Sequence, residues 1–171
     1  FLPVMIIIGL GIAGLMTNPL EEVSFKSVIG LAVAGLLLPL FPLHGLFISI
    51  ATKAPRPIGT LLTVATPILG IFAFCSFQNQ FSEELLKVVS IISLSGALYA
   101  TIKAIVQNKV SQRIAYGTMA LYSILWWHMG SAGQLTNSAT LFAASLILAS
   151  FGLLFGWDRI RLRYGDLNLN Q

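Results

Sequence analysis

Charged side chains are scarce in this chain. Only 9% of its 171 residues are Asp, Glu, Lys or Arg, whereas 56% are hydrophobic and the mean hydropathy is +0.86. Soluble domains contain about 25% charged residues, so an ordinary soluble domain is excluded and an all-α, polytopic transmembrane helix bundle is predicted. The net charge of +4 does not indicate a nucleic-acid partner, because the basic residues are spread over the ends of the predicted helices.

Cysteine and the patterns typical of catalytic sites are also lacking. The single cysteine, Cys75, excludes a disulfide within the chain and a thiolate metal cluster. The sequence has no glycine-rich phosphate loop after a strand, no serine–histidine–aspartate arrangement with enough polar partners, and no two histidines with an acid at metal-ligand spacing. We therefore expect no catalytic residue, no metal and no flavin, quinone or nicotinamide cofactor in this chain.

A signal peptide is not evident either. The chain begins with Phe1, and its first 16 residues lack both a basic n-region and a small-residue cleavage site. We expect this N-terminus to be processed, or cut from a longer chain.

Six segments approach the roughly 20 apolar residues that a membrane-spanning helix needs. Breaker residues separate several of them, and Ser82 before two glutamates is typical of a helix N-cap, so the fourth helix should start near Ser82. The sequence predicts one bundle over residues 1–171, with spans at 1–17, 26–48, 58–77, 83–106, 112–130 and 138–157.

Six spans place successive loops on alternating sides of the membrane. This assigns each basic residue to one side or the other. Only Lys26 and Lys87 fall with the glutamates on one side, and the positive-inside rule predicts that the other side is cytoplasmic or equivalent and holds both chain ends. No charge falls near the middle of a span, so the usual mark of an ion path is missing. The eight basic residues on the positive side are Lys53, Arg56, Lys103, Lys109, Arg113, Arg159, Arg161 and Arg163.

Two prolines and a histidine end the apolar run of the second span. Proline removes a backbone donor and clashes with the carbonyl four residues back, so Pro39 should free the carbonyl of Gly35, and Pro42 that of Leu38. We expect the helix to break there, as broken membrane helices do around ion sites. His44 by itself fits an interfacial or internally satisfied histidine; beside a break it is a candidate for a proton path.

Pro67 is a further proline within a predicted helix, in the third span. It should free the carbonyl of Thr63 and kink the helix. The hydroxyls of Thr63 and Thr66 are candidates to satisfy that carbonyl.

Three stretches carry a family resemblance: "PLFPLHGLFISIATKAPRPIGTLL", "ALYATIKAIVQNKVSQRIAYGT" and "GWDRIRLRYGDL". They resemble, in order, the broken-helix signature, the Ala-Tyr turn and the polar linker of the antiporter-like membrane subunits of complex I, the multisubunit sodium/proton antiporters and the membrane-bound hydrogenases. The positions in register are Pro39, Pro42, His44, Gly45, Ala54, Pro55, Gln107, Ile114, Ala115, Tyr116 and Thr118.

The resemblance implies a place in the fold and a set of partners. The chain would hold the sixth to eleventh of the family's usual fourteen helices and straddle two inverted repeats. It implies partnership with other membrane subunits of a multisubunit complex, in a bacterial inner, thylakoid or mitochondrial inner membrane.

The same resemblance shows that proton-relay residues are missing. The two family lysines fall on Leu37 and Ile68, and a family histidine and occasional lysine fall on Phe142 and Leu146. Residues 46–51 replace the family's aspartate and second histidine, and residues 120–122 replace its Ser-His-Met. The motif "WWHMG" at 126–130 is seven residues out of register, and we interpret it as an aromatic belt at the membrane surface.

Small residues predict close helix packing. Gly152 and Gly156 form a GxxxG pattern, continuing a run of alanines and serines. Two readings remain open, packing against a partner and packing within the chain's own bundle.

Three functional hypotheses follow. The first is a degenerate antiporter-like subunit with a structural role and little or no proton conduction of its own. The second is a proton-conducting half-channel through His44, completed by a partner chain that supplies the missing lysines. The third is a fragment of a longer antiporter-like subunit.

Overall fold

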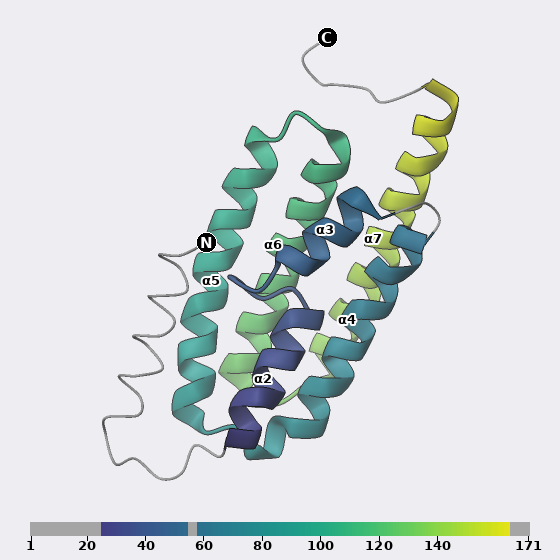
Figure 1. Ribbon diagram of the computed structural model, residues 1–171. Helices are drawn as coiled ribbons and strands as arrows, with labels where there is room; N and C mark the ends of the chain where they lie inside the picture. Colours follow the sequence, from purple (N-terminus) through teal and green to yellow (C-terminus); the bar gives the residue numbers. More distant parts are fainter. Residues whose placement is uncertain (1–24, 55–57, 165–171) are drawn as a thin grey trace.

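The fold is a bundle of α-helices (Figure 1). The computed structural model describes residues 25–54 and 58–164, with side chains from Gly30 onward. No strand occurs in these ranges, so the predicted all-α bundle is confirmed, while the first predicted span, 1–17, lies outside them. The elements are α2 (Phe25–Leu37), α3 (Gly45–Lys53), α4 (Ile58–Phe77), the short 3₁₀ helix η1 (Gln78–Gln80), α5 (Glu83–Val106), α6 (Val110–Ala132) and α7 (Asn137–Tyr164).

Three of the described helices are long and apolar enough to cross a membrane: α4 continued by η1 (Ile58–Gln80), α5 and α7. The 23-residue α6 is long enough but less apolar. It packs against α3, α5 and α7, and ten of its residues are buried, so protein rather than lipid surrounds much of its surface. Protein contacts tolerate the polar side chains that lipid would exclude.

The predicted second span is two helices rather than one. α2 ends at Leu37, residues 38–44 are not helical, and α3 begins at Gly45. α2 packs on α4, while α3 lies between α4 and α6, so the break falls inside the bundle (Figure 1). The break predicted from Pro39 and Pro42 is confirmed.

Pro67 behaves differently, because α4 runs through it without interruption. The Thr63 hydroxyl donates to the Thr60 carbonyl at 2.8 Å, and the Thr66 hydroxyl donates to the Leu62 carbonyl at 2.9 Å. The expectation that these hydroxyls satisfy the Thr63 carbonyl was therefore wrong. A threonine hydroxyl in a helix reaches carbonyls three or four residues back. The Thr63 hydroxyl therefore cannot reach its own carbonyl, and the Thr66 hydroxyl takes the carbonyl four residues back instead of that of Thr63.

The helix ends follow the predicted turn chemistry. The Leu85 amide donates to the Ser82 hydroxyl at 3.3 Å, which confirms Ser82 as the N-cap of α5. Gly133 ends α6 with a left-handed φ of 72°, a conformation that glycine adopts without strain. α7 continues to Tyr164, beyond the predicted end at residue 157.

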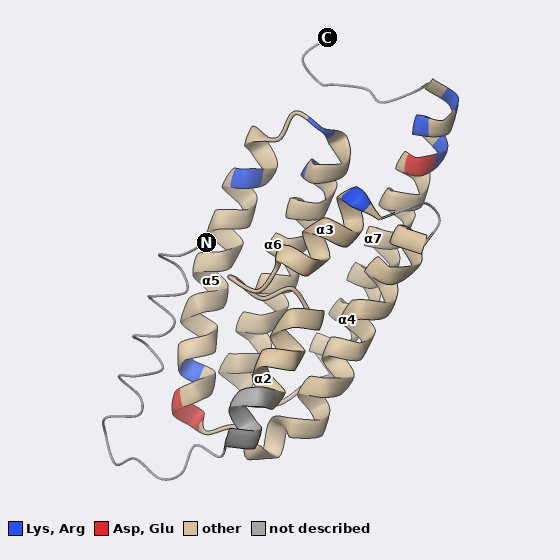
Figure 2. Ribbon diagram, viewed as in Figure 1, with Lys and Arg blue, Asp and Glu red and all other residues tan. Residues whose placement is uncertain are grey.

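Charges gather at the two ends of the bundle. Figure 2 shows basic residues of α3, α5, α6 and α7 at one end, and the acidic start of α5 with one basic residue at the other. At the second end Lys87 lies 4.0 Å from Glu83, one helical turn away. The described part of the chain has the charge asymmetry that the sequence predicts.

Glycines allow the helices to approach the break closely. A Cβ atom on Gly70 of α4 would lie 2.5 Å from the backbone nitrogen of Leu38, and one on Gly96 of α5 would lie 2.7 Å from Phe41 Cβ. By contrast, a Cβ on Gly152 or Gly156 of α7 would meet nothing within 4 Å in the described residues. Among the described residues, the GxxxG pattern forms no close helix contact, and its role in packing stays a prediction.

We predict that Gly70→Ala destabilises the chain, because the added methyl meets backbone that cannot move aside. Overpacking of this kind costs about 1–3 kcal/mol. Thermal unfolding of the purified chain in detergent, followed by circular dichroism, measures the loss. Gly152→Ala is the matched control: its methyl enters open space and alanine favours the helix, so its unfolding temperature should stay the same or rise. Equal behaviour of the two variants would contradict the close packing at Gly70.

Candidate functional site: the broken helix and its surroundings

Both carbonyls expected to be freed by the prolines have partners. The Gly35 carbonyl accepts a hydrogen bond from the Leu40 amide at 3.0 Å. The Leu38 carbonyl accepts one from the indole nitrogen of Trp126, on α6, also at 3.0 Å. A bond across 88 residues of sequence therefore closes the break, and no water-filled cavity is needed for these two groups.

Trp126 is a core residue. It is fully buried, and its ring meets the Phe74 ring edge-on with centroids 5.5 Å apart. The expectation that "WWHMG" forms an aromatic belt at the membrane surface was wrong for this residue. Its neighbour Trp127 is 41% exposed and still fits that position. The two tryptophans differ because consecutive helical residues point about 100° apart, which puts one of them inward.

His44 lies directly before α3, in a cluster of aromatic rings. Its ring stacks on Phe41 with centroids 5.8 Å apart and an interplanar angle of 13°. Tyr99 of α5 and Tyr116 of α6 approach it at centroid distances of 5.6 and 6.4 Å. His44 Nδ1 is buried and has no hydrogen-bond partner among the described residues.

The polar cluster continues toward the basic end. Tyr116 lies within electrostatic range of both Tyr99 and Lys103. Lys103 is in the last turn of α5, at the end where the other basic residues gather. The groups His44, Tyr99, Tyr116 and Lys103 thus reach from the break toward the basic end, and we name them the histidine–tyrosine cluster.

The interior on the other side of the break is apolar. Its buried core includes Leu38, Phe74, Phe81, Leu86, Val89, Leu125 and Met129. The serine hydroxyls buried among these helices donate to carbonyls of their own helix: Ser90 to Leu86, Ser93 to Ser90 and Ser123 to Met119. Such hydroxyls are already occupied and offer protons no continuous route. Two further buried polar atoms on α6, Tyr122 Oη and His128 Nδ1, have no hydrogen-bond partner among the described residues. In the described part of the chain, no chain of hydrogen bonds leads from the histidine–tyrosine cluster to the acidic end.

The positions predicted to correspond to the missing family lysines and histidine differ in burial. Leu37 is the last residue of α2 and is half-buried, while Ile68 is 50% exposed on the outer surface of α4. On α7, Leu146 is 4% exposed and Phe142 is 39% exposed. That these positions correspond to family lysines and histidines stays a prediction.

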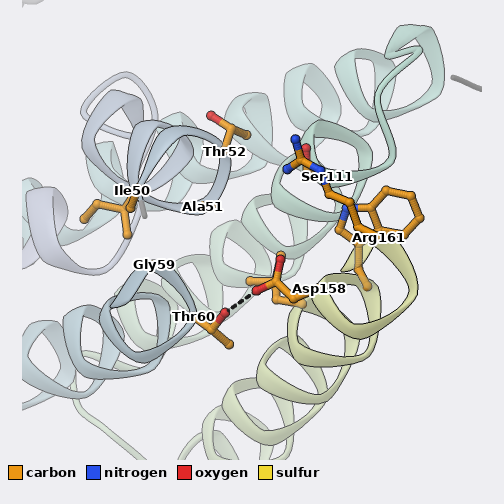
Figure 3. Close-up of a pocket in the computed structure, with 11 residues that line it drawn as sticks. Ile50, Ala51, Thr52, Gly59, Thr60, Ser111, Asp158 and Arg161 are labelled. Atoms are coloured by element: carbon orange, nitrogen blue, oxygen red, sulfur yellow. Dashed lines mark hydrogen bonds between the residues drawn. The ribbon is translucent and has the colours of Figure 1, made fainter. Parts of the chain in front are cut away.

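A second polar site lies near the basic end, between α4 and α7 (Figure 3). The Thr60 hydroxyl donates to Asp158 Oδ2 at 2.8 Å, and Arg161 and Ser111 line the same cavity of about 30 Å³. That volume is enough for one water molecule. The buried indole nitrogen of Trp157, which also lines the cavity, has no hydrogen-bond partner among the described residues and is a donor for such a water.

Sequence reasoning missed several of these residues. The resemblance assigns Asp158 to a polar linker, whereas it lies on α7, one residue beyond the predicted end of the sixth span. Tyr116 stands in the Ala-Tyr motif and carried a signal, but Tyr99 lies in an ordinary apolar run and carried none. No group of three His, Cys, Asp or Glu side chains that could hold a metal ion occurs in the part of the chain that the structure describes.

Comparison with known proteins places the chain among energy-coupling membrane proteins. The family described as NADH:quinone oxidoreductase/Mrp antiporter, TM, matches residues 8–168. The chain is 30% identical over 109 residues to NADH-ubiquinone oxidoreductase chain 5 of Phytophthora infestans. This alignment covers 58% of this chain and 16% of that protein. It is 31% identical over 83 residues to NADH-quinone oxidoreductase subunit L of Rickettsia bellii (strain RML369-C), covering 47% of this chain and 13% of that protein. The matches therefore span less than a fifth of either relative, and no solved structure matches the chain.

We predict that Trp126→Phe destabilises the chain, because it leaves the Leu38 carbonyl buried without its donor. The loss should be about 1–3 kcal/mol, with a further contribution from the smaller ring. Chemical unfolding in detergent micelles measures it, and Trp127→Phe is the matched control that should have little effect. A Trp126→Phe variant as stable as the wild type would show that the indole bond does not hold the break.

A second variant, Thr60→Val, tests the link between α4 and α7. Valine keeps the shape but removes the hydroxyl that donates to Asp158, and a hydrogen bond to a charged group contributes about 1.5–3 kcal/mol. We expect a loss of stability at the low end of that range, since Asp158 is half-buried. Thr140→Val is the control, because the exposed Thr140 hydroxyl donates to the carbonyl of Thr136, the residue just before α7, and does not link α7 to another helix. Equal stabilities would contradict a stabilising role for the Thr60–Asp158 bond.

Proposed function

The chain belongs to the NADH:quinone oxidoreductase/Mrp antiporter transmembrane family, and from this membership we propose that it works in the membrane arm of a complex I-type or related ion-translocating assembly. Its partners would be the neighbouring membrane subunits. Its role would be structural, with no complete proton path of its own. As a single bundle it would correspond to the middle six helices of the antiporter-like fold, with the basic end, and both chain termini, on the cytoplasmic, stromal or matrix side.

One observation carries this proposal: polar groups reach only part of the way through the described bundle. The histidine–tyrosine cluster occupies the side of the break toward the basic end, and the other side is packed with apolar side chains. A proton path needs titratable groups, or water, within hydrogen-bonding reach of one another across the membrane. On this part of α6 the described titratable side chains are Tyr122 and His128, and Tyr122 Oη and His128 Nδ1 are buried without a hydrogen-bond partner among the described residues. The buried serines nearby are bonded to their own helices, so the described residues offer no continuous hydrogen-bonded route there.

A second candidate function rests on that cluster. His44, Tyr99, Tyr116 and Lys103 would form an entry half-channel from the basic side, and a partner chain would supply the rest of the route. In this case His44 would exchange protons during turnover. The two candidates differ in whether removing the imidazole changes proton flux.

We predict that His44→Ala leaves proton flux unchanged when the intact native complex is reconstituted in liposomes. Flux is followed with a pH-sensitive dye, and a native gel confirms that the complex still assembles. His128→Ala is the matched control, because it removes the chain's other histidine, which lies on α6 beyond Trp126 and outside the histidine–tyrosine cluster. A loss of flux in His44→Ala alone, with assembly intact, would reject the structural role and favour the half-channel.

A further inference from the structure

An apolar groove runs along the outer side of α5 and α6. Its volume is about 600 Å³, and its lining includes Thr101 and Ala104 of α5, Arg113, Gly117 and Leu121 of α6, and Leu153 of α7. Small side chains form part of the lining, and a Cβ atom added at Gly117 would meet nothing within 4 Å. The groove is thus open at Gly117, because glycine has no side chain to fill it.

The rim of the groove faces away from the bundle. Ile105 is 70% exposed, Leu153 is 58% exposed and Leu121 is 42% exposed. In a chain that crosses a membrane, such side chains meet hydrocarbon or another apolar body rather than water. A groove of about 600 Å³ with apolar walls along two helices has room for an alkyl chain.

Arg113 gives the groove a chemically distinct end. It stands in the first turn of α6, and its Nη2 atom donates to the carbonyls of Ile105 at 3.3 Å and Gln107 at 3.1 Å, at the end of α5. These two bonds hold the guanidinium between the helix ends. An arginine has five donors arranged in a fork that matches phosphate, so Nε and Nη1 remain to face an anion.

We propose that this groove binds an anionic phospholipid of the surrounding bilayer, with the phosphate on Arg113 and an acyl chain along α5 and α6 past Gly117. A lipid suits both ends of the site, since its phosphate lies at the depth of the helix ends and its chain extends into the hydrocarbon. Basic sites between transmembrane helices on the cytoplasmic or matrix side recognise anionic headgroups in this way. A neighbouring helix could fill the apolar part, but it would have to bring an anion to the level of Arg113.

Photocrosslinking tests the site in the intact native complex reconstituted in nanodiscs. The probe is phosphatidylglycerol with a diazirine near the end of one acyl chain, and phosphatidylcholine with the same tag is the comparison. We expect the anionic probe to label peptides within residues 101–121, and unlabelled phosphatidylglycerol to compete better than phosphatidylcholine. Arg113→Gln should reduce the labelling about tenfold, as expected for the loss of a charge-assisted hydrogen bond.

Two variants separate the headgroup from the chain. Gly117→Leu should block the groove and reduce labelling by both probes, because the new side chain extends into the groove from a position where an added Cβ meets no described atom within 4 Å. Arg163→Gln, on the exposed end of α7, and Ala144→Leu, on the exposed face of α7, are the matched controls and should label as the wild type does. A native gel confirms assembly of each variant.

Other outcomes would overturn the proposal. Equal labelling by the two probes, together with no effect of Arg113→Gln, would show that the groove has no anionic site. Protection of residues 101–121 from both probes in the wild-type complex, with zero-length crosslinks from this stretch to another helix, would show that protein occupies the groove.

Discussion

The hydrogen bond from Trp126 to the Leu38 carbonyl is the contact on which the arrangement around the break depends. Inside a membrane, a backbone carbonyl that proline leaves without its helical partner cannot accept a hydrogen bond from water. Leaving it unpaired costs several kcal/mol. Tryptophan suits this place because its indole has one donor and no acceptor, so a single bond satisfies both partners. A serine or glutamine would pair the carbonyl but bring a further polar group into the core.

The position of the break, held by the Trp126 bond, also determines the positions of the residues and helices around it. α3 leaves the break between α4 and α6, and His44 comes to lie beside Tyr99 and Tyr116. Gly70 and Gly96 admit the backbone and side chain of the irregular segment, because any larger residue would occupy the same space. The Thr60–Asp158 bond joins α4 to α7 nearer the basic end, so the helices around the break are also connected away from it.

Local features of the fold could be predicted from the sequence because local rules govern them. Pro39 and Pro42 act on the turn that contains them, and Ser82 caps the helix that follows it. Trp126 and Asp158 could not be assigned in the same way, since their partners lie 88 and 98 residues away and no periodicity marks them. Pro67 shows a limit of the local rule. Proline helps to end α2, but Pro67 lies inside a continuous α4, where neighbouring helices bury it.

The location of polar groups around the break also bears on what a partner could contribute. The buried residues of α4 include Thr63, Thr66, Gly70 and Phe74, whereas Ile68 is on its outer surface. A lysine brought by a neighbour to the Ile68 side would therefore meet the outside of α4 rather than the histidine–tyrosine cluster. To extend that cluster, a partner would have to reach the apolar core that Phe74 and Trp126 fill, and displacing two packed aromatic rings would remove the support of the break itself. The contacts that satisfy the break are thus part of the apolar core on its far side.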